Sequence, residues 1–181
     1  YRLESQAELA RVFEESRSRS VGGEVILEQF LDGPEVNVVA IVLNSRIREM
    51  TISDRIKDAE KGFGVVMRHL YPCGLNAEMT AAIGALCQRT VEAMELEHGI
   101  IFPQIIATSR GPYVVETGVR IPGGVMKELF EYATGYDLVR LQLDISLGAL
   151  QDLSTYKSHP GHRAVTVKFI NGDPGPLAPG K

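Results

Sequence analysis

The 181-residue chain contains no tryptophan, only two cysteines and no run of basic residues. Its 19 lysine and arginine residues are outnumbered by 23 acidic residues, and the net charge of −4 argues against general binding of nucleic acid. No apolar run approaches the roughly 20 residues of a membrane-spanning helix, and no signal peptide is visible. The spacing of Cys73 and Cys87 matches no metal site, so reduced thiols in a cytoplasmic protein are expected.

Several familiar active-site motifs are also lacking. The sequence has no Walker-type phosphate loop, no Gly-x-Ser-x-Gly elbow, no kinase signature and no dinucleotide fingerprint after a strand. The composition itself is ordinary, because 44% hydrophobic and 23% charged residues are typical of a globular protein. The length allows one core or two small lobes.

The pattern of apolar residues predicts a sheet interrupted by helices. Ser5 and Asn76 are expected to cap helices that end near residues 16 and 97, and two shorter helices are expected further on. Those helices should cover residues 125–133 and 137–147, and strands are expected over residues 25–27, 36–43, 47–53, 65–70, 100–107, 113–119 and 165–170. Residues 54–64 and the tail from residue 172 should be loops. This order predicts an α+β protein with an antiparallel sheet and helices packed on one face.

The segment Glu28-Gln-Phe-Leu-Asp-Gly-Pro-Glu35 places an acid on either side of an apolar turn. Phe30 and Leu31 can cover a purine ring while neighbouring backbone groups meet its edge. Glu35 can accept hydrogen bonds from ribose hydroxyls. A plain strand and turn with two solvated acids is the alternative interpretation.

The predicted hairpin of residues 100–119 should bring Gln104 and Glu116 to the same end of the sheet. Converging oxygen ligands suit a hard divalent cation that also binds phosphate, although a polar pair without metal is the alternative. Arg120 can bind phosphate or carboxylate through its forked guanidinium. Gly123 and Gly124 allow close backbone approach just ahead of a helix N-terminus, which attracts anions. The alternative is a plain helix-start turn with a neighbouring arginine.

A third group of charged residues flanks the loop of residues 54–72. It consists of Asp54, Arg55, Lys57, Arg68 and His69. Lys57 could contact a phosphate and His69 a substrate group. A solvated charged loop is an equally good interpretation, because charged loop residues are normal on protein surfaces.

Three of these stretches resemble, in order and spacing, the motifs of the ATP-grasp ligases: residues 28–35, 104–116 and 116–124. The last is similar to the family pattern Glu-x-Asn-x-Arg-x-x-Gly-Gly, with Gly118 at the Asn position. The resemblance extends from about residue 3 to residue 177. It implies an ATP-grasp fold with a lobe of residues 1–53 for adenine and ribose and a lobe of residues 54–181 for metal and substrate. It also implies that a phosphate-loop lobe and an N-terminal domain precede this chain in a complete enzyme, which makes the chain a fragment that is inactive alone.

The resemblance implies that ATP binds with its adenine amino group at Glu28, its ring at the hinge formed by Phe30 and Leu31, and its ribose at Glu35. It assigns Mg2+, or Mn2+, to Gln104 and Glu116. Contacts to substrate are implied for four further residues: Lys57, His69, Gly123 and Gly124.

The catalytic residue implied by the resemblance is Arg120, which would contact the transferred phosphate or an acyl phosphate. Gly118 cannot supply the side-chain oxygen of the usual Asn. We therefore expect weaker metal binding, binding of a single metal ion, or a ligand from elsewhere.

The implied activity is ATP-dependent ligation of a small-molecule carboxylate to an amine or thiol. Amino-acid or peptide ligases and proteins similar to carbamoyl-phosphate synthetase fit best, with the glycinamide ribonucleotide and biotin carboxylase branches also open. The resemblance is compatible with a homodimer of the full-length protein. A degenerate, non-catalytic nucleotide-binding or protein-interaction domain is the main alternative, and a chance match to an unrelated α+β domain is the third.

Overall fold

The computed structural model describes residues 1–57 and 65–170. The chain divides into two compact units, Tyr1–Asp32 and Gly33–Lys181. The lobe boundary expected after residue 53 falls inside a strand of the second unit. The expected loop over residues 54–64 is described only to residue 57, where the backbone is still a strand, and the tail expected from residue 172 lies outside the described residues.

The first unit is built on one helix. A 3-10 turn, η1 (Gln6–Glu8), leads into α1 (Leu9–Arg19). Glu8 Oε2 accepts a hydrogen bond from the backbone amide of Ser5 at 3.3 Å, as the capping box predicts. The strand expected over residues 25–27 does not form, and two of its three apolar side chains are exposed. An apolar run becomes a strand only where another strand pairs with it, and these residues pair with no described strand.

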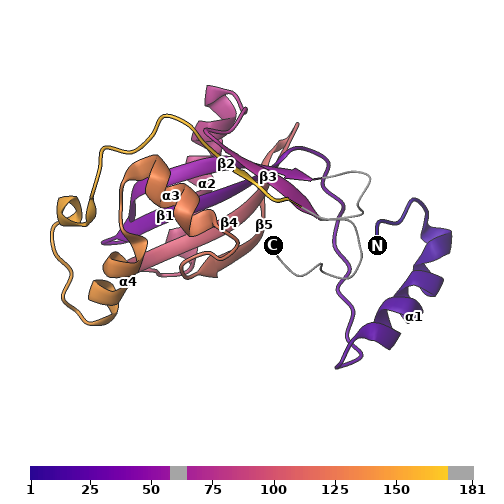
Figure 1. Cartoon of the computed structure of the whole chain (residues 1–181). Helices are drawn as coiled ribbons and strands as arrows, with labels where there is room; N and C mark the ends of the chain where they lie inside the picture. Colours follow the sequence, from indigo (N-terminus) through magenta and orange to yellow (C-terminus); the bar gives the residue numbers. More distant parts are fainter. Residues whose placement is uncertain (58–64, 171–181) are drawn as a thin grey trace, which may run out of the picture. The chain divides into compact units, whose positions relative to one another are not determined.

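The second unit contains a six-stranded sheet in the order β5-β4-β1-β2-β3-β6 (Figure 1). All neighbouring strands are antiparallel, which confirms the expected sheet type. The strands are β1 (Glu35–Leu43), β2 (Arg46–Lys57), β3 (Val66–Tyr71), β4 (His98–Thr108), β5 (Gly111–Val119) and β6 (Val165–Lys168).

The helices of this unit follow the predicted order. They are α2 (Ala77–Ala93), α3 (Met126–Thr134), α4 (Leu138–Ser146) and the short 3-10 helix η3 (Leu153–Tyr156). Asn76 caps α2 as predicted, because its side chain accepts from the Met79 amide at 2.8 Å. The helix ends earlier than expected, since Glu95 adopts a positive φ of 51°. None of the helices in the described residues is long and apolar enough to cross a membrane.

The sheet is covered on both faces, not on one face as expected. Val39 and Ile41 of β1 pack in the same core as α3 and α4, whereas Val38 and Ala40 pack in a second core with α2. Alternate residues of a strand point to opposite faces, so a strand that is apolar throughout needs cover on each side. Figure 1 shows α3 and α4 on the near side of the sheet and α2 behind it. The α+β class is otherwise confirmed.

Candidate functional site

A row of polar residues crosses three neighbouring strands. Asn37 of β1 lies opposite Gln104 of β4, and Gln104 lies opposite Glu116 of β5. Residues directly opposite in antiparallel strands share a face, and here it is the face covered by α3. Gln104 Nε2 donates to Glu116 Oε1 at 2.5 Å. The structure therefore brings together the two residues that were predicted to hold a metal ion.

A cleft of about 350 Å³ opens along this row, between the sheet and the segment that precedes α3. Four of the predicted site residues line it: His69, Gln104, Gly123 and Gly124. Gly124 has a φ of 62°, a left-handed conformation that a glycine adopts without strain. The cleft therefore contains one residue predicted to bind metal, Gln104, together with the residues predicted to contact substrate, His69, Gly123 and Gly124.

Arg55 also lines the cleft, and it joins a group of three charged residues. Its NH1 atom donates to Glu35 Oε2 at 2.6 Å, and Lys57 pairs with the other carboxylate oxygen. All three side chains are largely buried, between 18% and 26% exposed. Arg55 and Lys57 share the Glu35 carboxylate, and the cationic Arg55 lines the cleft, where it favours a neighbouring anion.

The predicted substrate residue His69 is buried, at 4% exposure. Burial lowers the pKa of His69, and the neighbouring Arg55 lowers it further, while the Asp54 backbone opposes both effects. The ring lies edge-on to Phe169, with centroids 5.9 Å apart. The imidazole is therefore neutral near pH 7 and offers one donor and one acceptor to its neighbours, not a positive charge.

Arg120 lies at the edge of the cleft. Its guanidinium is 5.9 Å from the ring centroid of Phe102, a lining residue, and NH1 donates to the backbone oxygen of Ile121 at 3.3 Å. A Cβ atom placed on Gly118 would lie 3.4 Å from Arg120 Nε. Gly118 therefore leaves space that the arginine side chain borders, and an Asn at this position would compete for that space.

The predicted adenine hinge belongs to the first unit of the chain. Glu28 and Phe30 are exposed and Leu31 is partly buried there. The guanidinium of Arg2 stacks over the Phe30 ring at 4.1 Å.

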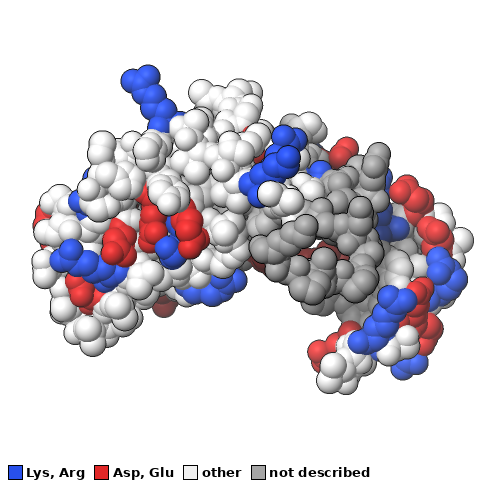
Figure 2. All heavy atoms as spheres, in the orientation of Figure 1, with Lys and Arg blue, Asp and Glu red and all other residues white. Residues whose placement is uncertain are grey.

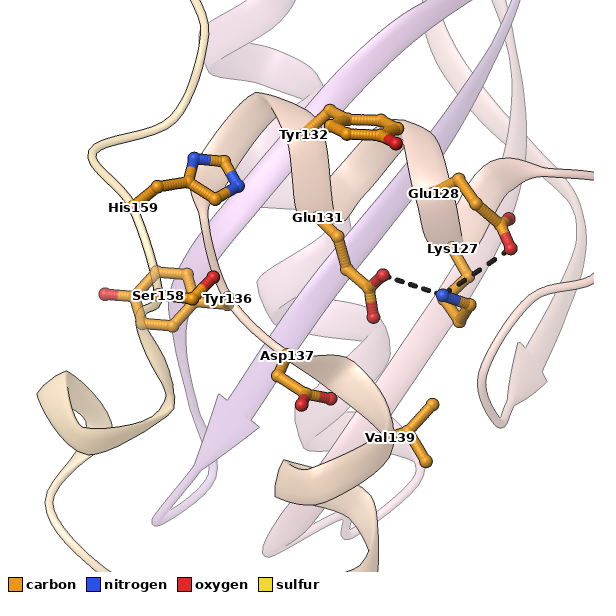
Figure 3. A pocket seen from close by; sticks show the side chains of 9 residues that line it. All are labelled: Lys127, Glu128, Glu131, Tyr132, Tyr136, Asp137, Val139, Ser158 and His159. Atoms are coloured by element: carbon orange, nitrogen blue, oxygen red, sulfur yellow. Dashed lines mark hydrogen bonds and ion pairs between the residues drawn. The ribbon is translucent and has the colours of Figure 1, made fainter.

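A second cavity, of about 460 Å³, lies beside α3 and α4 (Figure 3). Lys127 pairs there with Glu131 at 2.7 Å and with Glu128 at 3.5 Å, as the dashed lines in Figure 3 mark. Glu131 and Asp137 accept hydrogen bonds from backbone amides of α4. These charged groups already stabilise the helices, and no predicted site residue lines the cavity. The cleft above the sheet is therefore the better candidate site.

Figure 2 shows acidic and basic side chains interspersed with uncharged ones over the described residues of the second unit, on the face that is drawn.

The residues of the cleft fit a magnesium ion of modest affinity. The described residues contain no group of three or more histidine, cysteine or acidic side chains that could hold a metal. Gln104 and Glu116 supply an amide oxygen and a carboxylate, which are hard oxygen donors. Magnesium commonly binds one or two carboxylates and completes its shell with water and phosphate oxygens, and this donor set is compatible with that mode of binding.

Two residues of the cleft were missed or left without a role by the sequence interpretation. Arg55 was grouped with a charged loop, whereas β2 continues through it and places it opposite His69. Asn37 was overlooked, although it is the one polar residue within residues 36–43, which are otherwise apolar. A single polar residue within an otherwise apolar strand is the feature of the sequence that could have indicated a functional role for Asn37.

The fold is that of an ATP-grasp protein. The family described as phosphoribosylglycinamide synthetase, ATP-grasp (A) domain, matches residues 2–123, more than half of the chain. The chain belongs to this family, and the expected ATP-grasp fold is confirmed.

Individual relatives include ligases. D-alanine–D-alanine ligase of Flavobacterium johnsoniae is 27% identical over 127 residues, which cover 67% of this chain and 38% of the ligase. The crystal structure of an L-amino acid ligase from Bacillus licheniformis superposes with a TM-score of 0.69 at 25% identity, covering 81% of this chain and 36% of the ligase.

A third match shows the fold in a nucleotide complex. The biotin carboxylase domain of Hydrogenobacter thermophilus 2-oxoglutarate carboxylase, in complex with MgADP, ADP and bicarbonate, has a TM-score of 0.64 at 19% identity. The match covers 81% of this chain and 33% of that domain. The chain thus spans less than half the length of each of these three proteins.

Proposed function

We propose that the chain is part of an ATP-dependent ligase that joins a small-molecule carboxylate to an amine, or to a thiol, through an acyl phosphate. The observation that carries the proposal is the single cleft, which gathers Gln104, His69 and the Gly123–Gly124 turn beside the partner of Gln104, Glu116. The kinship with amino-acid ligases supports it. The adenine contacts of Glu28, Phe30 and Leu31 belong to the same proposal.

In this reaction a carboxylate oxygen attacks the γ-phosphorus of ATP, and the bond between that phosphorus and ADP breaks. The amine nitrogen then attacks the acyl carbon and loses a proton as the C–N bond forms, and phosphate leaves as the C–O bond breaks. Magnesium, when bound at Gln104 and Glu116, neutralises phosphate charge.

The protein's own contribution is mainly electrostatic. Arg55 places a guanidinium cation at the cleft, and the backbone of Gly123 and Gly124 lies where an anion can approach it closely. Arg120, at the cleft edge, is the residue proposed to contact the transferred phosphate. Glu35, held by Arg55 and Lys57, is proposed to bind the ribose.

Calorimetry with ATP and ADP, each with and without Mg2+, tests the nucleotide site. We expect binding that tightens with Mg2+, followed in the intact protein by ADP release that requires both a carboxylate and an amine. An intact protein that binds no nucleotide would contradict the proposal.

One observation favours the alternative of a non-catalytic nucleotide-binding domain. Gly118 supplies no metal ligand, and the Arg120 side chain borders the space beside it. This alternative predicts nucleotide binding by the intact protein without ADP formation for any carboxylate and amine pair. The same assay therefore separates the two functions.

A further inference from the structure

We propose that Asn37 is a ligand-binding residue of the cleft, whose Oδ1 atom accepts a hydrogen bond from an N–H or O–H group of the bound molecules. The inference rests on the proposed function, because it assigns a role within the same cleft. Asn37 lies outside the sequence motifs of residues 28–35, 104–116 and 116–124.

Asn37 is 3% exposed and lines the cleft, yet its Oδ1 atom has no hydrogen-bond partner within the described part of the chain. A buried polar atom without a partner costs about 1–3 kcal/mol. Val39, the next residue of β1 on the same face, is fully buried and apolar. An apolar residue at position 37 would avoid the cost of the unpaired oxygen, so the asparagine points to a function.

The other amide atom fixes the direction in which the oxygen faces. Asn37 Nδ2 lies 3.4 Å from His69 Nδ1 and 3.7 Å from Met126 Sδ, both of which can accept a hydrogen bond. An amide nitrogen only donates, so His69 Nδ1 accepts and the ring proton resides on Nε2. The amide oxygen therefore faces away from both partners and is left for a ligand.

Met126 packs beside the same amide. Its Sδ atom lies against Nδ2, and Oδ1 has almost no solvent-accessible area. Methionine has three rotatable bonds and repacks readily. Met126 also follows the Gly123–Gly124 turn, where an added Cβ atom would meet open space. A ligand entering between this turn and the sheet would reach Asn37 by displacing one flexible side chain.

Two bound groups could supply the hydrogen. One is a water molecule of a magnesium ion held at Gln104, which lies directly opposite Asn37 on β4. The other is the N–H of an amine substrate placed near Arg55 and His69. Both are hydrogen-bond donors at the same oxygen, and a binding experiment with separate ligands distinguishes them.

The test compares Asn37→Leu with Thr51→Val in the intact protein. Leucine has the same number of side-chain heavy atoms in the same branching pattern and removes the oxygen. Thr51 is a matched control because it is 1% exposed, its Oγ1 is likewise without a partner among the described residues, and it lies outside the cleft. Thermal unfolding establishes that both variants fold, and calorimetry measures ATP with Mg2+, ATP alone and L-alanine.

We expect Thr51→Val to bind like the unsubstituted protein and Asn37→Leu to bind about tenfold more weakly in one arm. Loss confined to ATP with Mg2+ identifies the metal-bound water, and loss confined to L-alanine identifies the amine. Asn37→Asp, which keeps acceptor oxygens, should restore most of the affinity.

Unchanged affinities of Asn37→Leu in all arms would overturn the role of Asn37 and leave the proposed function intact. An unsubstituted protein that binds no ATP would overturn both. If Asn37→Leu does not fold, NMR of the unsubstituted protein provides the test. The side-chain amide signals of Asn37 should shift on addition of MgATP or L-alanine. Unchanged signals would refute the contact.

Discussion

Gln104 and Glu116 face each other across β4 and β5, and the amide of Gln104 donates to the carboxylate of Glu116 at 2.5 Å. The bond uses one carboxylate oxygen. The second oxygen of Glu116 and the amide oxygen of Gln104 make no other hydrogen bond within the described residues. The pair is thus preorganised with two oxygen atoms free for a cation, and its charge of only −1 makes that cation depend on nucleotide phosphates for affinity.

Replacing Glu116 with alanine should abolish the magnesium dependence of nucleotide binding, because the only carboxylate of the pair is lost. Calorimetry of ATP with and without Mg2+ measures the effect, which we expect to be tenfold or more in the magnesium arm alone. Glu116→Gln is the matched control for shape, and it should retain the bond geometry but not the charge. Magnesium dependence that survives in Glu116→Ala would rule out this residue as a ligand.

Replacing Glu35 with alanine should weaken ATP and ADP alike, by about tenfold, because the ribose is common to both. The loss also leaves Arg55 and Lys57 without their shared carboxylate. Adenine, which lacks the ribose, separates the two consequences. Its affinity should not change if Glu35 acts on the ribose, and a parallel loss for adenine would indicate a general disturbance instead.

Replacing Arg55 with glutamine should weaken binding of anionic ligands in the cleft, because the substitution removes a cation that lines it. Pyrophosphate is a suitable probe, and its affinity should fall and become less sensitive to salt. Arg46→Gln is the control. Arg46 lies on the same strand in an exposed pair with Glu92, at 3.1 Å, outside the cleft. Equal effects of the two substitutions would argue against an anion site at Arg55.

Replacing Arg120, which lies at the edge of the cleft, should affect turnover more than nucleotide affinity. Arg120→Ala should lower turnover in the intact protein by about 10²–10³-fold while nucleotide affinity is largely kept, as expected for a group that acts on developing charge. ADP release and calorimetry on the same preparation measure the two quantities. Normal turnover in the variant would exclude the catalytic role.

The parts of the site that sequence could predict are those set by local structure. The hairpin of β4 and β5 brings Gln104 and Glu116 close together because a short turn sets its register, and a bulge between Gln104 and Ile105 then shifts the pairing by one residue, so that Gln104 lies opposite Glu116. The pairing of β1 with β4 joins strands that are separated by β2, β3 and α2, so no local pattern predicts that Asn37 lies opposite Gln104. Residues 25–27 show the reverse case, since their apolar run has the right composition but pairs with no described strand.

The two-sided cover of the sheet and the place of Arg55 have the same physical origin. The sequence of a strand that is apolar at every position does not show whether helices cover one face of the sheet or both. The helices that pack against it determine this, and here they cover both faces. The charged residues after Ser53 looked like a loop by composition. Pairing with β3 keeps them in the sheet as far as Lys57, and this pairing moves Arg55 from a surface loop into the cleft.

The buried His69 should make the stability of the second unit depend on pH. Burial holds the pKa of His69 below its usual value, so between that lowered pKa and the unfolded value near 6.5 the unfolded chain binds a proton that the folded chain does not. The contribution is absent above about pH 7, and stability should fall as the pH drops below 6.5. Urea unfolding at several pH values should show a steeper loss for the unsubstituted chain than for His69→Gln, which cannot titrate. Parallel curves for the two proteins across this range would show that His69 does not resist protonation in the folded state.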